Sequence, residues 1–453
     1  MSSFKYLPSA GTPARRRRQR ALLGAACLAL SLLAVAPPAH AQLTLDAAIH
    51  AARRASPALR AATEGVNAAR ARERQAGALP NPTVAYGREQ TTRAGQTNAQ
   101  DIAQVEQPLE LGGQRASRRA AAAARRAVAE ARVESARAQL DLDVTRAFIV
   151  ATTAERRATL ADEARGTFAE AQRVSEERLR AGDVSGYAAR RLRLEVARYA
   201  ATRASVELER RTSRIALASL MGLTPAAGDS LALPSSPPAL GTEPPDGDSV
   251  TSLDTLVARA ERARPELRAA ALEVDAALAE ARLAARERIP RPTLSAGYKG
   301  ERVADSLSGS LSGFRGIVAG LSIPLPLFDR RSGAIEAAEA DARRQRAETD
   351  VVRRRIAAEV AEAAAALRAA EAQRSALAPH LGDDARVALR AVQASYAEGD
   401  ITLVEWLDAM RAYQDAESAY VTLQGEVALR RAALARAVGA PLAPSSPSSP
   451  PDR

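Results

Sequence analysis

The sequence predicts a mainly α-helical chain with a small β part, made of two similar halves that each follow the order helix, β-hairpin, long helix. Three observations predict this fold. Residues 45–60 and 253–268 are identical at eight of sixteen positions, which indicates an internal duplication. Hydrophobic periodicity changes from helical to alternating and back in the same order in both halves. Proline and glycine markers recur at similar spacing, which chance similarity in an alanine-rich chain does not explain.

Residues 1–41 are predicted to be a signal peptide. A basic cluster at Arg15–Arg18 precedes an apolar run over 21–36, and Ala39-His40-Ala41 supplies the small residues that a signal peptidase requires. The alternative is an N-terminal membrane anchor, but the apolar run of roughly 16 residues is short for a bilayer span of about 20. We therefore expect the mature chain to begin at Gln42.

Removal of this segment changes the interpretation of the charge. The segment holds six basic residues and no acidic ones, so the mature chain keeps 58 basic and 53 acidic groups, a net charge of +5. These charges alternate in sign along predicted helices, which is typical of solvated helix faces and not of a phosphate-binding surface. We expect no nucleic-acid partner.

The residue inventory also limits the chemistry of the chain. The one cysteine, Cys27, lies in the signal segment, and the mature chain has two isolated histidines, His50 and His380. Disulfides, a thiolate nucleophile and a Cys/His metal cluster are therefore excluded. No catalytic triad, phosphate loop or dinucleotide motif is present in the sequence. The sequence predicts no enzyme activity, no cofactor and no metal site.

The first element of each half is predicted to be a helix, over about 44–78 and 252–288. A proline pair stops each helix, because proline lacks the amide donor and clashes with the preceding turn. These pairs are Pro80/Pro82 and Pro290/Pro292.

Four strands are predicted next, over about 82–92 and 100–109 in the first half and 292–304 and 312–325 in the second. In the second half polar or small residues alternate with apolar ones, as in a strand with one drier face. Each strand is about 10 residues, the length that a tilted transmembrane strand needs. A four-stranded open sheet cannot span a membrane alone, so several copies would have to share one barrel.

Long helices complete each half. Residues 109–224 contain no proline, and helical periodicity over about 113–181 corresponds to roughly 100 Å. Gly182-Asp183 ends this helix, and a second helix runs over about 186–221. The second half repeats the plan, with Pro379 interrupting its long helix.

Two Pro-rich stretches mark the domain boundaries. Residues 224–250 are predicted to be a linker rich in Pro, Gly, Ser and Asp, and residues 441–453 a disordered Pro/Ser tail. The first repeat then covers 42–223 and the second repeat 251–440.

These features resemble the TolC-type outer-membrane efflux proteins over nearly all of the mature chain. The resemblance rests on the duplicated plan, the opening LTLDAAIHAARRASPALR, the turn LPNP, and the tip motifs AGDVS (181–185) and EGDIT (398–402). It implies a homotrimer with a 12-stranded β-barrel, four strands from each subunit, on a long periplasmic coiled-coil tunnel. It also implies three partners: a periplasmic adaptor (membrane fusion) protein, an inner-membrane resistance–nodulation–division pump, and outer-membrane lipid.

A narrower resemblance concerns cargo. PLELGGQRASR (108–118) and IPLPLFDRRSGAI (323–335) are similar to the metal-efflux (CzcC-like) branch, although Gln114 stands where that branch often has lysine. This implies a passive duct for heavy-metal cations. A drug-efflux or type I secretion duct of the same family is the alternative. A periplasmic structural coiled coil or adaptor protein is the alternative from a different class.

The resemblance places the periplasmic entrance near the start of the last helix. The matching acidic residues are Glu405 and Asp408, one helical turn apart on one face. Threefold repetition would form carboxylate rings, which attract cations. The structural alternative is that Thr402 and Glu405 form a capping box and that Asp408 pairs with Arg411.

The helical tips are implied to contact the adaptor. Glycine and aspartate there also have a plain interpretation, since glycine tolerates positive φ and aspartate caps helices. The tip residues are Gly182, Asp183, Ser185, Gly399, Asp400 and Thr402. Trp406, which follows the second tip, is expected to pack inside the bundle.

Overall fold

The computed structural model of the protein describes residues 42–93, 96–238, 252–304, 310–378, 381 and 383–442. The chain divides into two units, Met1–Leu43 and Thr44–Arg453, and all elements below belong to the second. The predicted signal peptide lies outside the described residues. So do residues 239–250 of the predicted linker, Pro379, and all but two residues of the predicted tail.

The helix that opens each half is broken in two. The halves begin with α2 (Leu45–Ala55) and α3 (Pro57–Ala76), and with α7 (Leu253–Ala263) and α8 (Pro265–Glu287). The prediction of one continuous helix in each half was therefore wrong. The residue before each proline is extended, with ψ of 117° at Ser56 and 120° at Arg264, because a following proline disfavours the helical region. Proline itself is well placed in the first turn of the next helix.

The strands form a single antiparallel sheet in the order β1-β2-β3-β4. Their bounds are Thr83–Arg93, Gln96–Pro108, Thr293–Ala304 and Leu311–Ser322. The two hairpins join directly, because β2 pairs with β3 along Ala99–Pro108. The predicted fold class of a mainly helical, duplicated chain with one small sheet is confirmed.

The long helices run as predicted, with one addition. The first half contains α4 (Gln114–Ala181) and α5 (Gly186–Leu220), and the second half contains α9 (Ser332–Leu377), α10 (Asp383–Glu398) and α11 (Leu403–Ala437). A short helix, α6 (Pro225–Asp229), stands at the start of the expected linker. Thr224 caps it and Pro225 occupies its first turn, so the local sequence favours a helical turn there.

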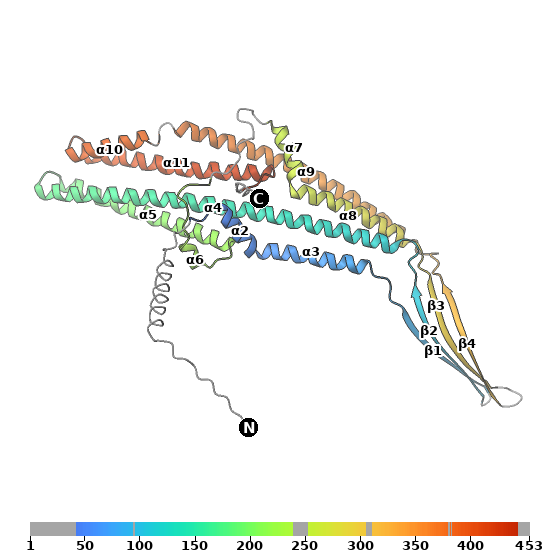
Figure 1. The fold of residues 1–453 in the computed structure, drawn as a ribbon. Helices are drawn as coiled ribbons and strands as arrows, with labels where there is room; N and C mark the ends of the chain where they lie inside the picture. The colour runs from blue at the N-terminus through green and yellow to red at the C-terminus, as the bar shows by residue number, and fades with distance from the viewer. Residues whose placement is uncertain are drawn as a thin grey trace, which may run out of the picture. The chain divides into compact units, whose positions relative to one another are not determined.

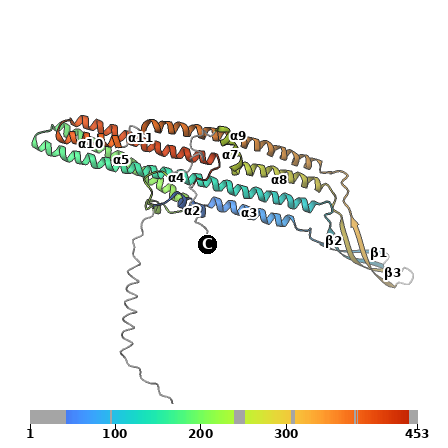
Figure 2. The ribbon, with the colours of Figure 1, turned by 45° about the horizontal axis from the view of Figure 1, so that its top comes forward.

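Helices α3, α4, α8 and α9 lie side by side in that order, and the sheet continues from their ends (Figures 1 and 2). Away from the sheet, α5 packs on α4, and α11 packs on α9, α4 and α10. None of the helices in the described parts of the chain is both long and apolar enough to cross a bilayer. The two halves thus meet along α4, whose far end forms one of two helical tips.

Candidate functional site

The strand register sorts the sheet into two chemically different faces. Directly paired residues of neighbouring strands point to the same face, and side chains alternate along each strand. One face is apolar over three consecutive rows except at Gln107, which pairs with Leu294. Its apolar residues are Val84, Tyr86, Ala103, Val105, Leu294, Ala296, Tyr298, Ile317, Ala319 and Leu321. The opposite face carries mainly polar side chains and glycines, among them Gln104, Glu106, Ser295, Gly297 and Gly320.

A charged row bounds the apolar face on the side of the hairpin loops. Arg88, Asp101 and Arg315 occupy this row together with Gly300. Asp101 accepts a hydrogen bond from the Tyr86 hydroxyl at 2.8 Å and lies 3.9 Å from the Arg88 guanidinium. The sheet therefore has one apolar face of limited height and one mainly polar face, an alternation that is typical of the wall of a water-filled barrel.

Both helical tips use the same backbone turn. Gly182 and Gly399 have φ of 87° and 90°, the left-handed conformation that glycine adopts without strain. At the first tip the amide of Asp183 donates to the carbonyl of Arg178 at 2.9 Å, and at the second the amide of Asp400 donates to Ser395 at 2.9 Å. Each is a Schellman-type ending that satisfies otherwise free carbonyls.

The helices that follow the tips are capped by hydroxyls and not by the aspartates. The Ser185 hydroxyl accepts from the amide of Ala188 at 3.2 Å, and the Thr402 hydroxyl accepts from the amide of Glu405 at 3.3 Å. The expectation that Asp183 and Asp400 act as caps was therefore wrong. Both aspartates are exposed.

Glu405 forms the predicted capping box. Its carboxylate accepts hydrogen bonds from the amide and the hydroxyl of Thr402, each at 2.8 Å. These bonds lower the pKa of the Glu405 carboxyl below its ordinary value of 4.5, and the bond from the Thr402 amide has the larger effect. The side chain is exposed, so its charge still faces solvent. The capping role and a role at an entrance are therefore compatible.

Asp408 is less engaged than Glu405. The Arg411 guanidinium approaches its carboxylate at 3.4 Å, and 62% of the Asp408 side chain is exposed. A bond of that length is weak. The other terminal nitrogen of Arg411 contacts the carboxylate of Glu195, whose side chain is nearly buried. Arg411 is thus held mainly by Glu195, which leaves the Asp408 carboxylate available to solvent.

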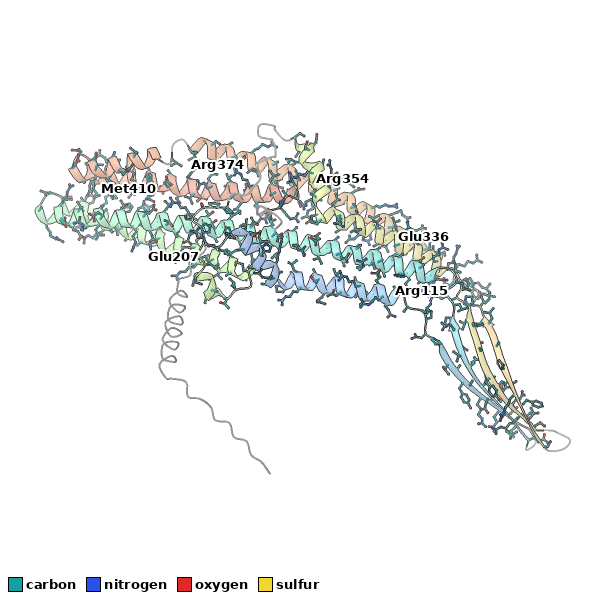
Figure 3. All side chains as sticks on the ribbon, in the orientation of Figure 1. Arg115, Glu207, Glu336, Arg354, Arg374 and Met410 are labelled. Atoms are coloured by element: carbon teal, nitrogen blue, oxygen red, sulfur yellow. The ribbon has the colours of Figure 1, made fainter. Side chains whose placement is uncertain are left out.

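A buried aromatic cluster joins the two tips. Trp406 is 2% exposed, stacks on Tyr396 with ring centroids 5.2 Å apart, and meets Phe168 edge-on at 5.5 Å. Phe168 in turn stacks on Tyr199 at 4.1 Å. The rings come from α4, α5, α10 and α11. Met410 of α11, labelled in Figure 3, belongs to the same cluster. Trp406 therefore packs inside the bundle, as the sequence predicted.

Comparison with known proteins decides the family. The family model described as "Outer membrane efflux protein" matches residues 48–223 and 256–440, which include nearly all of both halves. The chain belongs to the outer membrane efflux protein family. The predicted resemblance to TolC-type channels is confirmed, and this efflux protein is an outer-membrane protein with a periplasmic helical portion. Its family consists of channel and transport proteins.

Individual relatives agree with the family assignment. The efflux protein is 26% identical over 391 residues to the cobalt-zinc-cadmium resistance protein CzcC of Cupriavidus metallidurans, covering 85% of this chain and 87% of the relative. Its fold is similar to the outer-membrane channel OprN, with a TM-score of 0.70, 21% identity, and coverage of 90% and 95% of the two chains. CusC matches with a TM-score of 0.67, 18% identity, and coverage of 89% and 93%.

Several tip residues were not identified from the sequence. Arg178 donates to the carbonyls of Tyr396 at 3.3 Å and Ala397 at 2.5 Å, so the first tip holds the end of α10. Glu195 was also missed, although Arg411 was recognised as a candidate partner of Asp408. Among the described residues, no group of three or more His, Cys, Asp or Glu side chains is arranged to hold a metal ion.

Proposed function

We propose that this protein is the outer-membrane duct of a tripartite efflux system, and that heavy-metal cations pass through it. The cargo proposal is supported by the similarity to CzcC, which extends over most of both chains. The duct itself would be passive. An inner-membrane resistance–nodulation–division pump and a periplasmic adaptor would select the cargo and supply the driving force.

The assembly we propose is a homotrimer. Strands β1 and β4 are the two edges of the sheet, and unpaired backbone groups at such edges cost several kcal/mol each in hydrocarbon. Pairing β4 of one copy with β1 of the next would remove both edges. Three copies would form a 12-stranded barrel whose outer surface is the apolar face of the sheet. The proposal of a membrane-spanning duct rests on one observation: the strand register places apolar residues on one face of the sheet and mainly polar residues on the other.

We place the periplasmic entrance at the tips. Glu405 and Asp408 are exposed, lie one helical turn apart and carry no strong ion pair, so three copies would bring six carboxylates together. Such rings favour cations. The adaptor would contact the exposed turn residues Gly182, Asp183, Ser185, Gly399, Asp400 and Thr402.

Deletion of the gene tests the cargo. We expect cells without the protein to become sensitive to cobalt, zinc or cadmium, and the intact gene to restore tolerance. Unchanged metal tolerance together with new sensitivity to dyes or detergents would contradict the metal proposal and support a drug-efflux duct.

Single-channel recording tests the entrance. Asp408→Ala combined with Glu405→Ala should lower the preference for cations and weaken block by trivalent cations. Asp183→Ala removes an exposed carboxylate from the other tip and is the matched control, which should leave both properties unchanged. Asp408→Ala alone separates the entrance from helix capping, because Asp408 is outside the capping box. If selectivity and block survive Asp408→Ala, this residue does not line the entrance.

A further inference from the structure

The segment that follows β4 exposes an unusual amount of apolar surface. Residues 323–328 have the sequence IPLPLF, and all six are exposed. Phe328 is fully exposed at 100%, and no described side chain covers it. Ile323 continues the alternation of the apolar face of β4, which ends with Ile317, Ala319 and Leu321. The segment therefore prolongs the apolar face of the sheet toward the helices.

The apolar face of the strands is too short to cover a membrane. From Ile317 to Ile323 there are six residue steps of about 3.4 Å, which span about 16 Å of bilayer thickness at a tilt of about 40°. The apolar band of an outer-membrane barrel is about 25 Å tall. The band cannot extend toward the loops, because Arg88, Asp101 and Arg315 form the next row there. The missing height must lie on the helix side, where residues 324–328 follow.

A groove beside this segment has the chemistry of a headgroup site. It has a volume of about 630 Å³ and is lined in part by Pro326, Arg288, Arg330, Glu336 and Glu339. Among the described residues neither Arg288 nor Arg330 has an ion-pair partner, whereas the adjacent Arg331 contacts Glu287. Guanidinium groups bind phosphate, and the two carboxylates suit an ammonium group. Figure 3 shows Glu336 on α9 at the end nearest the sheet.

We propose that residues 323–328 insert into the periplasmic leaflet of the outer membrane and complete the apolar band of the barrel. In this arrangement Leu325, Leu327 and Phe328 contact acyl chains. Arg288 and Arg330 bind the phosphate of a zwitterionic phospholipid headgroup. This inference rests on the proposed membrane-spanning duct and adds where its periplasmic boundary lies.

The backbone of the segment argues against a neighbouring subunit as the occupant. Pro324 and Pro326 have no amide hydrogen, so a ladder with a strand of another copy would lack the donor at both positions. Insertion of side chains into lipid does not require backbone pairing with another strand when the backbone lies at the membrane–water interface, because water can then bind its polar groups.

Fluorescence quenching by lipid tests the proposal. Trp406 is the one tryptophan of the chain, so Trp406→Phe provides a background without indole. In that background Phe328→Trp, Leu321→Trp and Val351→Trp are reconstituted as the full-length protein into vesicles of brominated zwitterionic phospholipid. Val351 is exposed on α9 and is the control that should keep its fluorescence.

The position of the bromine reports depth. The indole of Phe328→Trp should lose fluorescence most when bromine is near the headgroup end of the acyl chain. The indole of Leu321→Trp should lose most with bromine near the methyl end, because the proposal puts Leu321 near the bilayer centre. Arg330→Gln added to Phe328→Trp should reduce the quenching.

Three outcomes separate the ideas. Quenching of Leu321→Trp without quenching of Phe328→Trp would overturn the lipid-inserted segment and leave the membrane-spanning sheet intact. Absence of quenching at both positions would contradict the proposed duct itself. Disulfide formation between copies of Phe328→Cys would assign the segment to a subunit contact, and it is readily detected because Cys27 is the one native cysteine and precedes the predicted mature chain.

Discussion

The two helical tips share a backbone turn but differ in charge. Both have a positive-φ glycine, the same amide-to-carbonyl bonds and a hydroxyl cap three residues after the glycine. At the third helical position, however, the first tip has Ala188 where the second has Glu405. One turn further, the first has Arg191 where the second has Asp408. The turn is constrained by backbone geometry in both halves, whereas the exposed charges are free to diverge. The acidic tip is therefore where we place the cation entrance.

The largest expected effect comes from the cluster that joins the tips. Trp406→Ala should lower the free energy of unfolding by about 3–5 kcal/mol, since it removes a fully packed aromatic side chain. Amide exchange should accelerate in both tips, because the cluster contains residues of α4, α5, α10 and α11. Tyr187→Ala, at a position 70% exposed, is the control and should change stability by less than about 0.5 kcal/mol. Faster exchange at the second tip alone would show that the tips are not coupled.

The shared turn is tested by replacing its glycines. Gly182→Val and Gly399→Val should each cost roughly 1–2 kcal/mol, because a β-branched residue is strained at positive φ. No atom lies within 4 Å of where a Cβ would be at either position, so the penalty comes from the backbone alone. Gly→Asn at the same sites should cost less. Urea denaturation measures the free energy of unfolding of the valine and asparagine variants. If valine is tolerated at one tip and not at the other, the two turns are not equivalent.

A smaller difference is expected between the caps. Ser185→Ala and Thr402→Ala should each destabilise the following helix by about 1 kcal/mol. The loss at Thr402 should be the larger, because it also removes the hydroxyl that donates to the Glu405 carboxylate. Comparison of thermal unfolding for the two variants with Ser185→Thr as the conservative control measures this difference. Equal losses would mean that the capping box adds nothing to a simple hydroxyl cap.

The smallest effect is a pH response confined to the second tip. The folded-state pKa of Glu405 is lowered, so its contribution is complete above the ordinary value of 4.5 and is lost as pH falls below it. Exchange protection at the start of α11 should decrease when pH is lowered through this range. The start of α5 should keep its protection, because Ala188 does not titrate. A parallel loss at both helix starts would point to general acid unfolding.

The sequence predicted those features that local signals specify. Glycine followed by aspartate marked both tips, Thr402 and Glu405 matched a capping box, and period-two alternation marked the strands. The breaks at Ser56 and Arg264 were missed although each precedes a proline. Apolar residues continue at helical spacing across the first break, from Ile49 to Leu59, which conceals the interruption.

Contacts between the halves could not be predicted from local patterns. Arg411 meets Glu195 across 216 residues, and Arg178 meets the carbonyl of Tyr396 across 218. The first pair joins α11 to α5 and the second joins α4 to α10, and the repeat in the sequence does not specify how these helices pack. The resemblance singled out Glu405 and Asp408, and the sequence offered Arg411 as a partner of Asp408, but Glu195, which holds Arg411, became visible only in the fold.

Helix α4 has a consequence for how the protein unfolds. It packs against α2, α3, α5, α8 and α11, while the buried cluster at the tips is separate from the clusters around Ile356 and Leu367, which Leu434 joins. Cooperativity in such a chain depends on neighbouring segments and resembles that of a repeat protein more than that of a globule. Local opening at the tips is then expected to leave the rest of α4 packed against α2, α3 and α8, so melting should proceed in regional steps.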